Sequence, residues 1–290
     1  MELFKMPATP FFSSEEDQEH YLKFGYVILR GLDTAAIERL RWKTLDFLEQ
    51  IRSKLPNRYF PVGQLMDFEA RDLSAAIIKE ELLPQIEKFF RAGTSIYPGT
   101  HLIKPFGRHS FLQAHQDSSL VDETKYHSVL IWCPLHPMNF LSGGLCVYPG
   151  SHLFGNIHRS TNVPWVFQKH LRFIYRNSKR VIVKPGEVCC FHTSLIHHSG
   201  HNFFSKFRLA VSALACSEGA GIINCFHDAD VPDEEVDIYT SDIDFFRKRD
   251  FNMRPTVPYQ LLERTKRRLP ALSVDELLEM HRKIRGLLEN

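Results

Sequence analysis

Two histidines and one aspartate are the residues of this chain best suited to hold a metal ion together. His115 and Asp117 are separated by one residue, and His197 follows much later in the chain. In a β-strand, residues i and i+2 point to the same face, so His115 and Asp117 are placed to bind one ion. Two imidazoles and one carboxylate form the ligand set of mononuclear non-haem Fe(II) sites, which leave coordination positions open. Zn²⁺ accepts the same ligand types, so a zinc site remains an alternative.

Arg208, eleven residues after His197, is a candidate for binding a carboxylate next to the metal. The run from Phe207 to Ala213 alternates, so Arg208 and Ala210 share one face of a predicted strand. If that face is interior, the buried guanidinium requires an anionic partner; on the outer face it would be an ordinary surface arginine. The guanidinium stays charged and binds a carboxylate through two parallel hydrogen bonds. It therefore suits 2-oxoglutarate, whose keto acid end chelates iron and whose distal carboxylate needs a cation.

Further motifs surround these residues in a fixed order. They are Phe24-Gly-Tyr-Val-Ile-Leu-Arg30, Leu130-Ile-Trp-Cys-Pro-Leu135, Gly143-Gly-Leu-Cys-Val-Tyr-Pro-Gly-Ser-His152 and the run from Val188 to Asn202 that contains His197. Together with the His-x-Asp pair and the arginine strand, they resemble the phytanoyl-CoA dioxygenase family of Fe(II)/2-oxoglutarate-dependent oxygenases. The resemblance covers roughly residues 20–216.

The resemblance implies that His115, Asp117 and His197 are the iron ligands. His198 departs from the family pattern, in which a small residue usually follows the third ligand, but the pattern Leu-x-His-x-Ser-Gly-x-Asn favours His197. Gln116 matches the family too, with its role left open. Related halogenases carry a small residue in place of the aspartate, so Asp117 favours hydroxylation over halogenation.

The same resemblance implies a co-substrate site. Arg208 would bind the distal carboxylate of 2-oxoglutarate, Ser199 would assist the arginine, and Trp132 would line the pocket. Asn202 matches without an assigned role. The expected activity is the hydroxylation of an unactivated C–H bond, with Fe(II) as cofactor and 2-oxoglutarate and O2 as co-substrates.

Short β-rich runs separated by Gly, Pro and Ser predict a mainly β protein with flanking helices (α+β), built on a double-stranded β-helix or cupin-like jelly roll. The predicted strands are residues 26–30, 96–103, 127–133, 144–148, 180–184, 187–192 and 207–215. We expect one domain over residues 1–290. It would have a helical cover over about 1–92, a jelly-roll core over about 93–217 and a C-terminal extension over about 218–290.

Several helices are predicted around this core. Asp33 or Thr34 begins an amphipathic helix with Ile37, Leu40, Leu48, Ile51 and Leu55 on one face. A second helix is expected over residues 73–90. Residues 164–175 are aromatic and basic, which is typical of either a lid near the cavity mouth or a core helix. Ser273-Val-Asp-Glu276 has the pattern of a capping box and opens a final helix, whose leucines would pack on the domain or on a second subunit.

The net charge of +2 hides an uneven distribution. No Asp or Glu occurs over residues 125–186, and acids are dense over residues 228–244. One interpretation is two surfaces joined by salt bridges; the other is a basic rim that steers an anionic substrate toward the metal. The basic residues are Lys125, Arg159, Lys169, Arg172, Arg176, Lys179, Arg180 and Lys184. No nucleic-acid-binding pattern is present.

The expected partner is an anionic small molecule or glycan, such as an acidic sugar of the Kdo type found in lipopolysaccharide, a phosphorylated metabolite or an acyl-CoA. The sequence has no apolar run long enough for a transmembrane segment, which leaves peripheral membrane contact open. The six cysteines form no CxxC pair and suit a reducing cytoplasm. The competing functions are a jelly-roll metal-binding protein without oxygenase activity and a sugar- or lipid-binding module with a vestigial triad.

Overall fold

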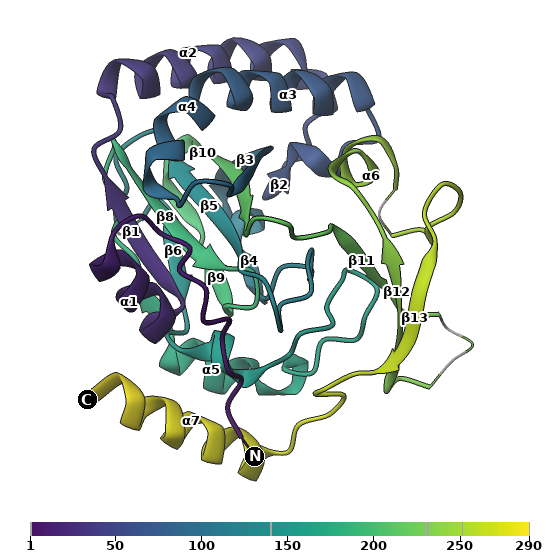
Figure 1. The fold of residues 1–290 in the computed structure, drawn as a ribbon. Helices are drawn as coiled ribbons and strands as arrows, with labels where there is room; N and C mark the ends of the chain where they lie inside the picture. The colour runs from purple at the N-terminus through teal and green to yellow at the C-terminus, as the bar shows by residue number, and fades with distance from the viewer. Residues whose placement is uncertain (1, 140, 229, 231, 251, 290) are drawn as a thin grey trace.

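Two antiparallel β-sheets form the centre of the computed structural model, which describes residues 2–139, 141–228, 230, 232–250 and 252–289 (Figure 1). The six-stranded sheet has the order β1-β8-β5-β10-β3-β2, and the four-stranded sheet has the order β4-β9-β6-β7. The strands of the larger sheet are β1 Tyr26–Arg30, β2 Phe60–Pro61, β3 Ser95–Gly107, β5 Ser128–Pro134, β8 Glu187–His192 and β10 Asn202–Cys216. Those of the smaller sheet are β4 Leu112–His115, β6 Leu145–Val147, β7 Lys179–Arg180 and β9 His197–Ser199. The predicted jelly-roll fold is confirmed.

The alternation of β10 explains why both faces of the larger sheet are buried. Leu209, Val211 and Ala213 belong to the core cluster under the helices, whereas Ala210 belongs to the cluster between the two sheets. Because successive side chains of a strand point to opposite faces, Arg208 shares the inner face with Ala210, as the sequence pattern predicts.

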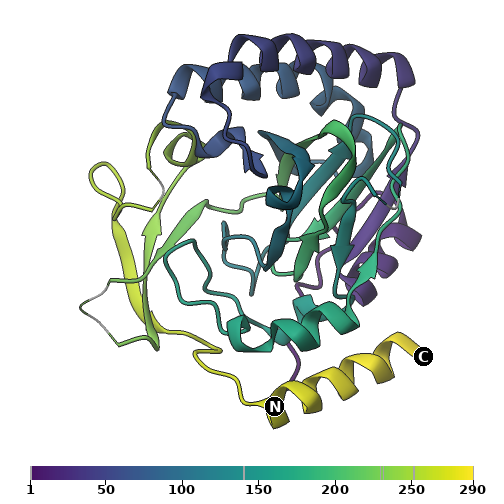
Figure 2. The same ribbon diagram turned by 180° about the vertical axis from the view of Figure 1, so that it is seen from behind.

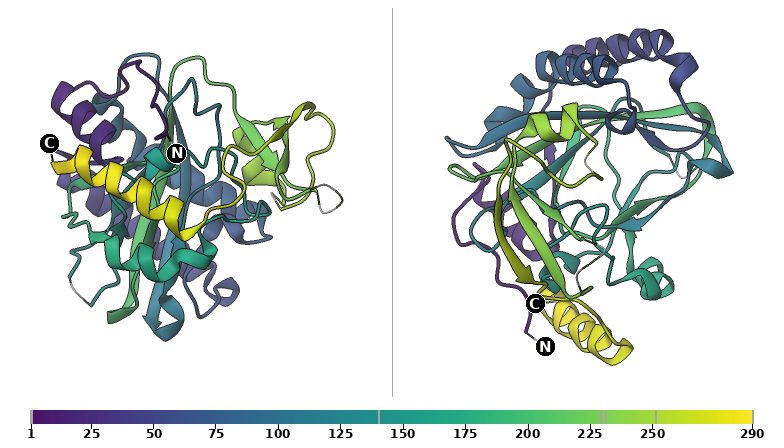
Figure 3. Two further views of the ribbon diagram at one scale, coloured as in Figure 1. Left: turned by 90° about the horizontal axis from the view of Figure 1, so that it is seen from below. Right: turned by 90° about the vertical axis from the view of Figure 1, so that its right-hand side faces the viewer.

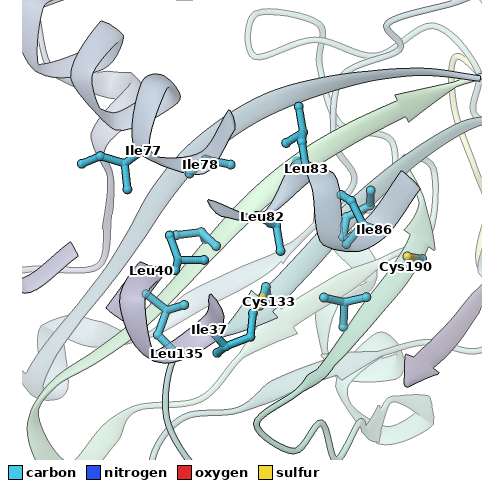
Figure 4. Packing of buried hydrophobic residues seen from close by; sticks show 14 of the residues in the cluster. Ile37, Leu40, Ile77, Ile78, Leu82, Leu83, Ile86, Cys133, Leu135 and Cys190 are labelled. Atoms are coloured by element: carbon cyan, nitrogen blue, oxygen red, sulfur yellow. The ribbon is translucent and has the colours of Figure 1, made fainter. Parts of the chain in front are cut away.

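Helices α2 Thr34–Gln50 and α3 Phe68–Glu81 cover the outer face of the larger sheet (Figure 1). Figure 4 shows Ile37 and Leu40 of α2 gathered with Cys133 of β5 in this interface. Asp33 caps α2, with its Oδ1 atom accepting a hydrogen bond from the backbone N–H of Ala35 at 2.9 Å. The predicted continuation of α2 to Leu55 is wrong, since the chain turns at Ile51 into a short 3-10 helix.

The helix predicted over residues 73–90 begins earlier and is interrupted. It consists of α3 and of α4 Leu83–Ile86, joined at Leu82. Pro84 explains the break, because proline has no N–H to donate within a helix and its ring crowds the preceding turn. The remaining helices are α1 Glu15–Phe24, α5 Leu171–Asn177, α6 Ile243–Lys248 and α7 Val274–Glu289. The 3-10 helices are η1 Arg52–Lys54, η2 Val62–Gln64, η3 Glu87–Phe89, η4 Arg108–Ser110, η5 Ser151–Phe154 and η6 Gln168–His170.

A third antiparallel sheet, not predicted from the sequence, stands beside the jelly roll (Figures 1 and 2). It contains β11 Ile223–Phe226, β12 Glu235–Thr240 and β13 Leu261–Lys266. The carboxylate of Asp237 is buried in it and pairs with Arg264 at 2.6 Å and Arg254 at 2.9 Å. Part of the acidic segment is therefore neutralised by arginines that follow it in the chain, and not by the acid-free stretch.

The final helix, α7, packs on the same chain. Leu277, Met280 and Ile284 lie in a cluster with Tyr148 and Phe154, and α7 lies beside α5 in the view from below (Figure 3). The capping box is confirmed: the backbone N–H of Ser273 donates to Glu276, and the backbone N–H of Glu276 donates to the Ser273 hydroxyl. Among the described residues, no helix combines the length and the apolar character needed to cross a membrane.

Candidate functional site

His115, Asp117 and His197 lie together where two strands of the smaller sheet meet. His115 at the end of β4 is directly opposite His197 at the start of β9, and Asp117 follows two residues after His115. The Nε2 atoms of both histidines lie 3.9 Å from the Asp117 carboxylate, one from each oxygen. The possible ligand atoms of the three residues all lie within 4.8 Å of one another. The antiparallel pairing of β4 with β9 thus brings the two distant motifs into one cluster.

The hydrogen bonds of the two imidazoles suit metal binding. His115 Nδ1 lies 2.9 Å from the carbonyl of Gln113, and His197 Nδ1 lies 3.0 Å from the carbonyl of Leu195. A carbonyl only accepts, so each Nδ1 carries the proton and each Nε2 lone pair is left for an ion. Burial lowers the pKa of His197 to about 4, which keeps the ring neutral. The Asp117 Oδ2 atom is buried without a hydrogen-bond partner among the described residues, so a cation fits here.

His198 lies outside this cluster. In β9, His197 is opposite Val147 of β6 and His198 is opposite Cys146, so alternation turns the two imidazoles to different faces. The His198 ring packs edge-on against Tyr175 with its centroid 4.9 Å away. The geometry thus favours His197, as the sequence pattern does.

The backbone of Asp117 is held on both sides. Its N–H donates to the carbonyl of Thr193 at 2.9 Å, and its own carbonyl accepts from Arg159 Nε at 2.8 Å. Arg159 is itself fixed by a buried ion pair with Glu123, with Nη2–Oε1 at 2.6 Å and Nη1–Oε2 at 2.8 Å. Arg159 is therefore a buried positioning residue, and its predicted place in an exposed basic rim is wrong.

Arg208, Ser199 and Trp132 line the same cavity as the cluster, whose volume is about 720 Å³. Arg208 is 2% exposed, and burial lowers its pKa to about 10, so it stays charged at neutral pH. Its guanidinium carbon lies 5.6 Å from the Trp132 ring centroid. Its Nε and Nη1 atoms and the Ser199 hydroxyl are buried without partners among the described residues. A carboxylate between them would satisfy these groups.

Lys104, a buried lysine, was missed in the sequence because an isolated lysine in a β-run carries no signal. Lys104 is opposite Arg208 in the β3–β10 pairing, and its Nζ donates to the carbonyl of Gly200 at 2.7 Å. Burial, with a contribution from Arg208, lowers the pKa of Lys104 to about 6. Lys104 thus fixes the turn that follows Ser199.

Gln116 supports the cavity wall. Its side chain points away from the triad, where its Oε1 atom accepts hydrogen bonds from Asn156 at 2.8 Å and from Trp165 at 3.1 Å. Its amide nitrogen donates to the carbonyl of Ser194. Asn156 and Trp165 both line the cavity. Gln116 therefore ties the metal-binding strand to the opposite wall.

Replacing Gln116 by alanine is expected to lower the free energy of unfolding by about 1–3 kcal/mol, because buried groups lose their partners. Iron content should be unchanged, since Gln116 does not face the cluster. Chemical denaturation measures the first quantity and metal analysis the second. The control is Gln113→Ala, three residues earlier in β4; Gln113 is exposed, and we expect a change within about 0.5 kcal/mol. Equal destabilisation by both variants would contradict the bracing role of Gln116.

The remaining charged residues are distributed differently from the prediction. Of the eight basic residues in the acid-free stretch, Arg159 is the one that lines the cavity in the described part of the chain.

Within residues 164–175, Pro164, Trp165 and Gln168 line the cavity, whereas Phe167 and Ile174 are buried in a core cluster. The segment therefore contributes both to the core and to the wall of the cavity, and the lid stays a prediction. Arg267 also lines the cavity and lies in the C-terminal extension, where no motif marked it.

Comparisons with known proteins place this geometry in a family. The model of the phytanoyl-CoA dioxygenase (PhyH) family matches residues 21–210, and the chain belongs to that family. Its fold is similar to that of the non-haem α-ketoglutarate-dependent carbocyclase SnoK from nogalamycin biosynthesis, at a TM-score of 0.54 and 16% identity over 74% of this chain and 89% of that one. It is also similar to EctD from S. alaskensis with 2-oxoglutarate and 5-hydroxyectoine, at a TM-score of 0.51 and 15% identity over 76% and 84% of the two chains. The search of curated proteins gave no match.

The protein is accordingly a 2-oxoglutarate-dependent non-haem iron dioxygenase, with Fe(II) as its metal and 2-oxoglutarate and O2 as co-substrates. The assignment of individual residues to these ligands, and the identity of the prime substrate, remain predictions.

Proposed function

We propose that His115, Asp117 and His197 hold Fe(II) and that Arg208 clamps the distal carboxylate of 2-oxoglutarate. Ser199 donates a further hydrogen bond to that carboxylate, and Trp132 forms a wall of its pocket. The reaction is the hydroxylation of an unactivated C–H bond of an anionic small molecule or glycan. The substrate candidates are an acidic sugar such as a Kdo-type residue, a phosphorylated metabolite and an acyl-CoA.

One observation carries this proposal. Three side chains that could hold a metal ion line one cavity with a buried arginine that has no carboxylate partner among the described residues. A buried guanidinium that lacks an anion is costly, so the arrangement favours a bound dianion that reaches from the metal to the arginine. A zinc site without a co-substrate has no use for Arg208 and Ser199, and the same argument disfavours a vestigial triad.

The bound metal and its co-substrates supply the oxidising power for the insertion of oxygen into the C–H bond. The residues of this chain have other tasks. The Nδ1–H bonds to Gln113 and Leu195 orient the two imidazoles, and Arg159 fixes the backbone of Asp117. The wall braced by Gln116 holds the substrate near the metal and limits the access of water.

The test is anaerobic titration of 2-oxoglutarate into the Fe(II)-loaded protein, followed by its metal-to-ligand charge-transfer absorption. We expect one iron and one 2-oxoglutarate for each chain and, on exposure to air, 2-oxoglutarate-dependent formation of succinate. Iron that binds without any charge-transfer band would overturn the proposed site. Tight zinc binding with no 2-oxoglutarate binding would favour the metal-binding protein instead.

A further inference from the structure

Arg267 is a second buried arginine of the cavity, and the proposed function gives it no task. It follows β13 in the C-terminal extension, outside the residues that the family model matches, and it is 4% exposed. Its Nη2 donates to the carbonyl of Pro164 at 2.6 Å and its Nη1 to the carbonyl of Asp233 at 3.0 Å. Its Nε is buried without a partner among the described residues. The guanidinium is thus held in a fixed orientation by neutral acceptors.

Arg267 differs from the other charged residues of the cavity in its counter-charge. The charged side chains that line the described cavity are Asp117, Arg159, Arg208 and Arg267. Arg159 is neutralised by Glu123. In the proposed site, the two charges of Fe(II) and that of Arg208 balance Asp117 and the two carboxylates of 2-oxoglutarate. Arg267 has no counter-charge among the described residues that line the cavity; the carboxylate of Asp233 acts on it from outside, but that side chain is exposed and forms its ion pair with His227.

No side-chain carboxylate of the described residues forms an ion pair with Arg267, although burial disfavours its charged form and lowers its pKa. Retaining a buried cation in this state is unfavourable unless a ligand supplies the anion. The neighbouring wall is polar: Thr161, Asn162 and Gln168 line the same cavity. These hydroxyl and amide groups suit a ligand that carries hydroxyls as well as a charge.

We propose that Arg267 is the anion-binding residue of the prime-substrate site and that it recognises a carboxylate or phosphate on a polar, hydroxylated substrate. His158 lies on the same wall, where burial lowers its pKa to about 4, and its ring Nδ1 has no partner among the described residues. It therefore adds a neutral hydrogen-bonding group beside the arginine. This inference rests on the proposed function. It adds the anionic group by which the enzyme would select its substrate.

The test uses matched pairs of probes that differ in the anion. They are D-glucuronate with D-glucuronamide, for a carboxylate, and glucose 6-phosphate with glucose, for a phosphate. Binding to the anaerobic protein loaded with Fe(II) and 2-oxoglutarate is measured by calorimetry. We expect at least one anionic probe to bind more tightly than its neutral partner. Arg267→Gln should remove this preference, weakening the anion about ten- to a hundredfold.

Arg268→Gln is the matched control. It removes the same charge from the next residue, which is exposed and stacks on Phe4 outside the cavity. We expect wild-type binding of every probe by Arg268→Gln. If neither anion is preferred by the wild type, or if Arg267→Gln keeps the preference, the inference is overturned.

Arg267→Lys provides the test should Arg267→Gln fail to fold. Lysine retains a cation and a donor for the two carbonyls but loses the planar fork, so the anion should still be preferred but bound about tenfold more weakly. Unchanged affinity would contradict the role of the guanidinium. Failure of the proposed function is distinguishable, because 2-oxoglutarate would then not bind to any variant or to the wild type.

Discussion

Replacing Asp117 by alanine is expected to abolish substrate hydroxylation, lowering it by more than about a hundredfold. Losing a hydrogen-bond partner of a metal ligand typically costs about ten- to a hundredfold, and this change removes a ligand and its charge. The purified variant should also retain less iron. The fold should remain intact, since the buried Oδ2 atom of Asp117 has no hydrogen-bond partner among the described residues. Iron analysis after gel filtration and succinate formation measure the two effects.

The control for this variant is Asp122→Ala. Asp122 is a partly buried acid of the same segment that pairs with Lys125 and lies outside the cluster. His197→Ala and His198→Ala form a second comparison, in which iron should be lost in the first variant and retained in the second. Full turnover by Asp117→Ala, or iron loss that follows His198, would contradict the assigned ligands.

Changing Arg208 to lysine is expected to raise the dissociation constant of 2-oxoglutarate about ten- to a hundredfold. Lysine keeps the charge but loses the second parallel hydrogen bond, and charge-assisted hydrogen bonds contribute about 1.5–3 kcal/mol. Arg208→Ala should weaken binding further because the buried charge is also lost. Iron content should stay near that of the wild type. The charge-transfer titration gives the midpoint for each variant.

Lys206→Ala serves as the matched control, because Lys206 lies two residues earlier on β10 and is exposed. Its titration midpoint should equal that of the wild type. An unchanged midpoint in both Arg208 variants would mean that another group binds the distal carboxylate, and Lys104, which is opposite Arg208 in the β3–β10 pairing, is the next residue to test.

The features that could be predicted from the sequence are those that depend on residues close together in the chain. Alternation along β10 is enough to place Arg208 on the inner face. The i, i+2 rule predicts that His115 and Asp117 lie together, although β4 ends at His115 and Asp117 is held by Thr193 and Arg159. The cap at Asp33 and the capping box at Ser273 need a few neighbouring residues only. The longer strands of the jelly roll could be located because each lies between turn signals. The short strands β2, β4 and β9 were not predicted, and the strand predicted over residues 180–184 is only the short β7.

The residues that were missed depend on distant parts of the chain. Arg159 becomes buried because Glu123 lies opposite it, and no local pattern distinguishes that arginine from the exposed basic residues near it. Arg267 enters the cavity through the pairing of β12 with β13 and its bonds to Pro164 and Asp233. The acidic residues of β12 suggested a solvated surface, whereas Asp237 is buried between two arginines.

The internal neutralisation of Asp237 makes the charge balance of the third sheet largely independent of the rest of the chain, which is useful for protein engineering. Its ion pairs with Arg254 and Arg264 lie within residues 223–264, whereas its small core of Cys225, Val236 and Ile238 also includes Val163. Arg71 of α3 donates to the carbonyls of Arg247 and Arg249 in the same segment. The triad and Arg208 all precede it. A chimera in which residues 223–267 come from another family member would therefore replace the segment that carries Arg267 and leave the proposed iron ligands in their own framework. Substrate selection would then be exchangeable without rebuilding the oxidising centre.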